Sequence, residues 1–346
     1  MYLERRLHFS CFNPFFRHGI WRAWLAYRDG RPVGRISAQV DRLHRAHYGL
    51  ASGHFGLFEA IEDEAVVAAL FRAAEAWLRS QGTEVITGPF NLSINQECGL
   101  LVEGFEKPPM FMMPHGKPCY DPMVQSQGYS TARNLYAYWA AADRFTNPQA
   151  VSHLNRRYGD KVKLRPFNRR WFKEELSIIR DIFNDAWADN WGFVPMTSAD
   201  MNELGMALRF FIADDLVCIA EIDNKPAAFI VILPNLNESF AKMRGRLFPS
   251  GIFNFIGDFR KKRIKTGRVL LMGVCQQYQN SPLGVALAFM VVNKAIESGR
   301  RKFPLMKELE ISWVLEDNKG MISMINMLDT MGGHRYKTYR LYQKQL

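Results

Sequence analysis

The sequence lacks the marks of a membrane-spanning, disulfide-stapled or metal-binding protein. No apolar run reaches the roughly 18 residues that a membrane-spanning helix needs. The five cysteines are scattered and odd in number, and no two form a CxxC pair, which argues against a disulfide framework and a zinc site. No cluster of His and Glu has the spacing of metal ligands, so we expect no metal. These absences favour a cytoplasmic protein, at most peripheral on the inner membrane.

The sequence does contain enough apolar material for two cores. It has 346 residues, of which 48% are hydrophobic and 13% aromatic, and one core rarely grows to this size. The order hairpin, strand, helix, strand, helix, strand occurs twice along the chain. The first hairpin is predicted as strands 21–28 and 31–41 around the turn Asp29-Gly30, and a strand of the second half is predicted at 308–315. We therefore predict an α/β (α+β) fold with two domains, residues 1–145 and 150–346, each a mixed, mostly antiparallel sheet flanked by helices.

The second half contains a loop suited to phosphate. Between a strand predicted at 268–274 and a helix predicted at 282–299, there is no Asp or Glu from Cys275 to Ala286. The free backbone N–H groups and the positive dipole end of such a helix attract anions. The matching turn of the first half reads Glu62-Asp63-Glu64, and these acids would repel a diphosphate. The sequence thus predicts an anion site in the second half alone.

This loop also carries a family resemblance. "VCQQYQNSPLGVAL" (274–287) resembles motif A of the GNAT superfamily, the acyl-CoA-dependent N-acyltransferases, with Gly replaced by Asn280 and Pro282. "ELEISWVLEDN" (308–318) resembles motif B. The first half resembles a degenerate GNAT-like copy, as in tandem-GNAT proteins. The stretches "GPFNLSINQECGLLVEGFEKPP" (88–109) and "NWGFVPMT" (190–197) are similar to a bacterial group that we associate with ceramide synthases, which acylate a sphingoid amine.

The resemblance implies a function and a set of binding residues. It implies an acyl-CoA-dependent N-acyltransferase, with acyl-CoA as co-substrate, that acylates a lipid-type (sphingoid-like) amine at the membrane surface. Pro282 has no N–H and removes one diphosphate donor. The residues placed against acyl-CoA are Met272, Gly273, Val274, Gln279, Asn280, Gly284, Val285 and Asn318.

Amine acylation needs a base for the amine and a proton for the departing thiolate. The first choice of base is Glu316, beside two other acids of the second strand, Glu310 and Asp317; His115 is the other candidate. Where the family places a tyrosine acid, this chain reads Met324-Ile325. Tyr278, Tyr336 or solvent would then protonate the thiolate.

The insertion at 235–267 is strongly basic. Residues 235–268 hold nine Lys or Arg, the last being Arg268, against two acids, a net +7 of the total +11. Ile252, Phe255, Ile256 and Phe259 fall at helical spacing before "RKKRIK". This pattern predicts an amphipathic helix within 248–265 on an anionic membrane surface. A core-packed helix with a solvated basic end is the alternative.

Two further functions stay open. Other tandem-GNAT proteins transfer an aminoacyl group from tRNA, and the basic insertion would then face RNA. Alternatively, Pro282 and the missing tyrosine would mark a non-catalytic GNAT-fold binding module. We favour acyl transfer and no nucleic-acid partner.

Overall fold

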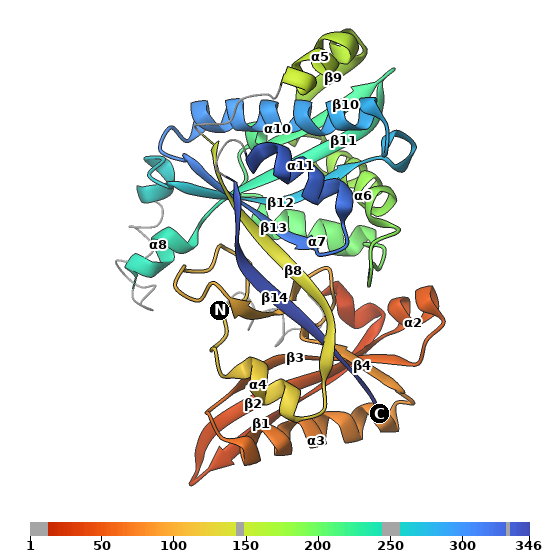
Figure 1. Ribbon diagram of the computed structural model, residues 1–346, viewed down its shortest axis with the longest axis vertical. Coiled ribbons are helices and arrows are strands. Elements are labelled where there is room, and N and C mark those ends of the chain that lie inside the picture. Colours follow the sequence, from red (N-terminus) through yellow and green to blue (C-terminus); the bar gives the residue numbers. More distant parts are fainter. Residues whose placement is uncertain (1–12, 143–148, 244–256, 330–332) are drawn as a thin grey trace. The chain divides into compact units, whose positions relative to one another are not determined.

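The computed structural model describes residues 13–142, 149–243, 257–329 and 333–346 (Figure 1). The chain forms two compact units. The first contains residues 1–136, 190–203 and 337–346, and the second contains residues 137–189 and 204–336. Each unit is therefore built from stretches that are separated along the chain.

The sheet of the first unit has the strand order β1-β2-β3-β4-β14, and β7 also pairs with β14. Helix α3 packs on β1 and β2. The elements are β1 (Gly19–Arg28), β2 (Arg31–Asp41), α2 (Arg42–Tyr48), β3 (Ser52–Ala60), α3 (Glu64–Ser80), β4 (Val85–Gly88), β5 (Phe90–Asn91), β6 (Glu97–Cys98), β7 (Leu100–Glu103), α4 (Tyr120–Ser126) and β8 (Ser130–Ala141).

The first hairpin, formed by β1 and β2, has the turn that its Asp29-Gly30 sequence predicts. Asp29 and Gly30 both have positive φ, 50° and 73°, as a two-residue turn matching the twist of its strands requires. Along β2, the alternate residues Ile36, Ala38 and Val40 are buried in the core that includes α3. The predicted hairpin is therefore confirmed.

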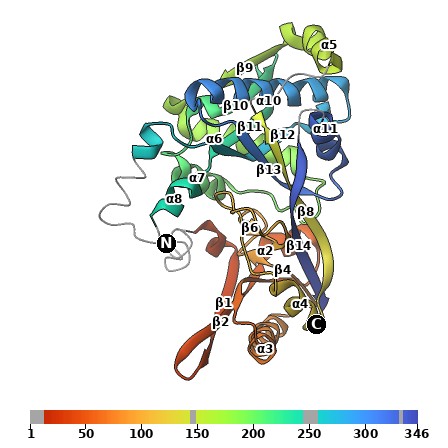
Figure 2. The same ribbon diagram turned by 60° about the vertical axis from the view of Figure 1, so that its left-hand side comes forward.

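The sheet of the second unit has the order β8-β13-β12-β11-β10-β9. Helix α10 contacts β10, β11 and β12, and α6 also contacts β11 and β12 (Figure 2). The elements of residues 149–346 are α5 (Gln149–Tyr158), β9 (Val162–Pro166), the 3-10 turn η4 (Arg169–Trp171), α6 (Phe172–Trp187), α7 (Ser198–Leu208), β10 (Val217–Ile222), β11 (Lys225–Pro234), α8 (Asn237–Lys242), β12 (Thr266–Val274), α10 (Pro282–Lys302), β13 (Glu308–Leu315), α11 (Lys319–Asp329) and β14 (His334–Gln345). Of these, the first part of α7 and most of β14 belong to the first unit.

The predicted element order occurs in both halves, but the last strand of each half joins the other sheet. Strand β8 is the neighbour of β13, and its residues from Ala137 belong to the second unit. Strand β14 pairs antiparallel with β4, from Tyr342 opposite Gly88 to Gln345 opposite Val85. The domain division predicted between residues 145 and 150 stays a prediction, because each compact unit contains part of the last strand of the other half of the chain.

Candidate functional site

Two parallel strands separate in the second unit. β12 and β13 pair from Thr266 opposite Glu308 to Val269 opposite Ile311. Beyond this pairing β12 continues to Val274 and β13 continues to Leu315. We call the unpaired parts, 270–274 and 312–315, the fork. Beyond Val269 and Ile311 the two strands no longer pair with each other, so the backbone groups on their facing edges need other hydrogen-bond partners.

Helix α10 begins eight residues after β12, and its first turn keeps backbone donors available. Ser281 caps the helix by accepting from Gly284 N at 3.1 Å, and its carbonyl accepts from Val285 N at 3.1 Å. Among the described residues, the N–H groups of Asn280, Ser281 and Leu283 have no hydrogen-bond acceptor. These donors lie at the positive end of the helix dipole.

The conformation of the turn explains one departure from the family pattern. Asn280 has φ 57°, in the left-handed region that favours glycine and that Asn tolerates better than most residues. Asn280 thus keeps the backbone shape that a glycine would give. Gly284 is required by space, because a Cβ there would lie 2.1 Å from the carbonyl oxygen of Tyr278.

Carboxylates reach the start of this loop from α6. Asp185 accepts from Gln276 N at 2.6 Å, and Asp189 accepts from Gln276 Nε2 at 2.9 Å. The loop has no acid of its own, yet its spatial surroundings are less free of acids than its sequence indicates. Burial, together with the charge of Asp185, raises the pKa of the Cys275 thiol to about 11. That thiol is therefore neutral near pH 7 and is a poor nucleophile.

The protein's own side chains hold two carbonyl groups of the fork. The indole of Trp187 donates to Met272 O at 2.9 Å, and Gln279 Nε2 donates to Val274 O at 2.8 Å. At Gly273, a Cβ would lie 3.0 Å from both Ala186 and Phe229, so this glycine allows α6 to pack closely. Four of the residues predicted to bind acyl-CoA thus have contacts inside the protein.

Two other predicted binding residues make contacts that stabilise helices. Asn318 Oδ1 accepts from Met321 N at 3.0 Å and so caps α11. Val285 uses its N–H within α10, and its side chain packs beside Phe289. None of these contacts tests acyl-CoA binding, so the roles assigned from sequence remain predictions.

An apolar cavity lies in the same unit, between the sheet and helices α10 and α11. It encloses about 40 Å³ and is almost entirely apolar. Met272 and Ile311, where the strands part, contribute to its wall. Other lining residues are Ala140, Val292, Ile296 and Met324. Such a space suits hydrocarbon rather than water, because it offers no polar partners.

A buried polar network crosses the paired part of β12 and β13. Glu310 is fully buried and accepts from the hydroxyls of Ser312 and Tyr336. Arg268, its register partner, donates to Ser312 Oγ at 2.8 Å and lies 3.8 Å from the Glu310 carboxylate. Arg268 is therefore a core residue, and counting it with the surface charge of the insertion was wrong.

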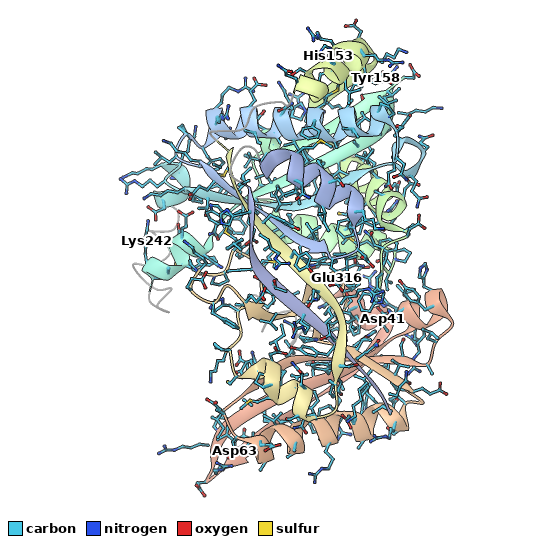
Figure 3. The ribbon with its side chains drawn as sticks, in the orientation of Figure 1. Asp41, Asp63, His153, Tyr158, Lys242 and Glu316 are labelled. Atoms are coloured by element: carbon cyan, nitrogen blue, oxygen red, sulfur yellow. The ribbon has the colours of Figure 1, made fainter. Side chains whose placement is uncertain are left out.

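The predicted catalytic residues are distributed over both units. Glu316 is half-buried in the loop after β13 (Figure 3), and Tyr278 is half-buried against the core of the second unit. His115 belongs to the first unit, where burial and the charge of Lys337 lower its pKa. From the sequence, Glu310 and Tyr336 are considered as separate residues. Their hydrogen bond joins positions 26 residues apart, and no sequence pattern predicts it.

The comparisons with known proteins place the chain in a family. It is 46% identical to Protein YghO of Escherichia coli (strain K12) over 347 residues, covering 100% of this chain and 87% of that protein. It is 42% identical to a Bacterial ceramide synthase of Caulobacter vibrioides (strain NA1000 / CB15N) over 339 residues, covering 96% and 86%. No model of a known protein family matches.

Solved structures agree on the fold. A tandem GNAT protein from the clavulanic acid biosynthesis pathway superposes with a TM-score of 0.55 at 12% identity, covering 95% of this chain and 83% of that one. A GCN5-related N-acetyltransferase from Sphaerobacter thermophilus gives a TM-score of 0.50 at 11% identity, covering 93% and 80%. The chain is a tandem-GNAT protein. It belongs to the family that includes YghO and the bacterial ceramide synthase.

In the first GNAT copy of this tandem-GNAT protein, the gap that corresponds to the fork is filled by another strand. β3 and β4 pair in parallel only from Ser52 opposite Val85 to His54 opposite Thr87. Next to this pairing, a Cβ at Gly56 would lie 1.8 Å from Phe90 O, and Leu57 N donates to Asn91 Oδ1 at 2.9 Å. Strand β5 thus occupies the gap beside β3.

The helix after this first fork is capped by an acid. Asp63 accepts from Val66 N at 3.1 Å and pairs with Arg28 at 2.7 Å (Figure 3). A carboxylate at a helix start is stabilised by the dipole and disfavours a second anion there. These contacts support the predicted difference between the two GNAT copies.

The described end of the basic insertion packs inward. Phe259 lies 6.3 Å from the ring of Phe211 and 5.9 Å from that of Phe303, and Ile264 is buried. Phe259 is thus half-buried against the core, as the core-packed alternative expects, but it also lines a surface groove, so the membrane contact of this segment stays a prediction. Ile252, Phe255 and Ile256 lie outside the described residues.

The described residues contain no helix suited to span a membrane and no group of metal ligands. None of the described helices combines the length and apolarity that crossing a bilayer requires. In the same part of the chain, no three His, Cys, Asp or Glu side chains come together as metal ligands.

Proposed function

We propose that this chain is an acyl-CoA-dependent N-acyltransferase for a lipid-type, sphingoid-like amine. The observation that carries the proposal is the separation of β12 from β13 beyond Val269 and Ile311, next to a helix start with unbonded N–H groups. The full-length relationship to a protein named Bacterial ceramide synthase supports the class of amine. The filled fork and acid-capped helix of the first unit favour the second unit as the site.

The diphosphate of acyl-CoA would bind the first turn of α10. Asn280, Ser281 and Leu283 would donate their N–H groups, and the helix dipole would add its positive end. Pro282 contributes no donor. Gly284 and Gln279 would act indirectly, because they give the turn its shape.

The pantetheine and acyl groups would occupy the fork and the apolar cavity. A pantetheine amide would compete with the Trp187 indole for the carbonyl of Met272. The acyl chain would then enter between Met272 and Met324, whose flexible side chains let the cavity widen. At its present volume the cavity holds only part of a long chain.

The chemical step moves one acyl group and one proton. The amine nitrogen attacks the thioester carbonyl, a C–N bond forms, and the C–S bond breaks. Glu316 would take the proton of the amine, and Tyr278 or solvent would give a proton to the thiolate. His115 remains the second candidate base.

A matched pair of substitutions tests the site. Asn280→Asp adds a charge where the diphosphate is placed, while Asp tolerates the same positive φ and suits a helix start. We expect the binding of palmitoyl-CoA, measured by calorimetry, to weaken by about tenfold or more, because the added carboxylate repels the diphosphate by up to a few kcal/mol. Acetyl-CoA should bind the native chain less tightly than palmitoyl-CoA.

The control is Asn224→Asp. Asn224 is exposed and has φ 59° in the β10–β11 hairpin, so this change adds the same charge in the same conformation away from the turn. Binding should remain as in the native chain. Equal affinities of both variants and the native chain, or no thioester binding at all, would refute the site.

A further inference from the structure

The second unit has a surface groove that is both cationic and aromatic. It encloses about 390 Å³. Its wall includes Arg169, Phe210, Arg260, Lys262 and Lys302, together with Asp214 and Asp215. This groove is formed by segments distant in sequence: Arg260 and Lys262 come from the basic insertion, whereas Arg169, Phe210 and Lys302 lie outside it.

Hydrogen bonds hold the groove's loop in place. Arg169 of η4 donates to the carbonyls of Arg209, at 2.8 Å, and of Ile212, and it pairs with Asp214. These bonds fix residues 209–214 against η4. The side chains that point outward from these two segments therefore stay exposed.

Two large aromatic side chains of these segments are exposed. Phe210 lines the groove and is 69% exposed, and Trp171, two residues after the lining Arg169, is 60% exposed. The guanidinium of Arg209 lies 4.4 Å from the centre of the Phe210 ring. Aromatic side chains next to cations are typical of the water–bilayer boundary, where the ring contacts acyl chains and the charge contacts phosphate.

The cations of the groove outnumber its acids. Arg260, Lys261 and Lys262 are exposed, and none of them, nor Lys302, forms an ion pair within the described ranges. Asp214 is already paired with Arg169, which leaves Asp215 as the other acid of the wall. The remaining positive charge would attract an anionic membrane.

We propose that this groove and its rim dock on an anionic bilayer. Arg260, Lys262 and Lys302 would contact lipid phosphates, and Phe210 and Trp171 would insert at the level of the headgroups. The docking surface overlaps the segment expected at 248–265, which supplies Arg260 and Lys262, whereas the exposed aromatic residues come from η4 and the 209–214 loop. Docking would bring a membrane-resident amine to the protein without its crossing water.

Vesicle co-sedimentation tests docking on the full chain. The native chain should bind vesicles of phosphatidylcholine with phosphatidylglycerol, less so at high salt, and should not bind phosphatidylcholine alone. The paired changes Arg260→Glu with Lys262→Glu, and Trp171→Ser with Phe210→Ser, should each lower the apparent affinity about tenfold or more, because each changes contacts worth a few kcal/mol.

Matched control variants separate docking from general charge and hydrophobicity. Arg156→Glu with Arg157→Glu makes the same charge change on exposed residues of α5, and Leu25→Ser with Tyr27→Ser removes exposed apolar side chains of β1. Both controls should bind like the native chain.

Three outcomes would overturn the proposal. These are no binding of the native chain to anionic vesicles, equal losses in control and groove variants, and binding of RNA that the groove variants lose while vesicle binding is unchanged. The assay contains no acyl-CoA, so its failure would leave the proposed acyl transfer untouched.

Discussion

At the scale of single residues, the structure separates two glutamates that follow each other closely on one strand and its loop. Glu310 is enclosed by Arg268, Ser312 and Tyr336, whereas Glu316 is half-buried at the end of β13. A carboxylate already held by a cation and two hydroxyls stabilises the strand pair. The more accessible one is better placed to take a proton from a substrate.

Substituting each glutamate by glutamine should therefore have different results. Glu316→Gln should lower kcat about 100-fold, as expected for losing a general base, and should lower the free energy of unfolding less than Glu310→Gln does. Glu310→Gln should lower the free energy of unfolding by about 3 kcal/mol, because Arg268 loses its buried anion. Steady-state acylation and urea unfolding measure the two effects. If the E316Q variant keeps native kcat, Glu316 is not the base.

The sequence could indicate single residues only where their local chemistry decides their role. Asp29-Gly30 identifies a turn, and Asp63 identifies a helix cap, since each acts on neighbours in the chain. The contacts of Arg268 with Ser312, and of Gln279 with Ala186, join residues far apart. No periodicity or spacing predicts such contacts, so the role of Arg268 was missed.

At the scale of elements, the start of α10 is the feature on which the proposed site depends. Gly284 lies in its first turn against the Tyr278 carbonyl, whereas Gly299 lies near its end with the flexible Met306 Cε 3.2 Å from a Cβ. The same substitution should therefore have opposite effects at the two positions.

Gly284→Ala should lower the free energy of unfolding by about 1–3 kcal/mol, because its methyl group meets backbone that must shift. Gly299→Ala should raise it by up to about 1 kcal/mol, because alanine favours the helix interior. Urea unfolding of both variants checks the pair. A destabilisation of equal size at both positions would show that the tight turn at Tyr278 is not special.

Elements with a buried apolar face were predictable, and short polar ones were not. The strands at 31–41 and 308–315 appear within the predicted bounds. Helix α2 has no buried residue and thus no hydrophobic period. Its signals were the capping Asp41, which accepts from Leu43 N, and Gly49 with φ 62°. Capping residues alone could have identified this helix.

At the scale of the whole molecule, each half of the chain contributes its last strand to the sheet of the other half. Strand β14 pairs with β4, and β8 is the neighbour of β13. Element order and the family resemblance predicted the tandem-GNAT fold, which relatives and solved structures confirm. The exchange itself could not be predicted, because either partner strand would satisfy the same hydrophobic pattern.

The most direct test of the account is whether the chain forms an amide. The full-length protein is incubated with palmitoyl-CoA and sphinganine, and mass spectrometry follows the lipid products while a thiol reagent follows free CoA. The account predicts N-palmitoyl sphinganine and free CoA in equal amounts, both formed about 100-fold more slowly by the E316Q variant. Free CoA without amide, or no reaction while palmitoyl-CoA is bound, would contradict it.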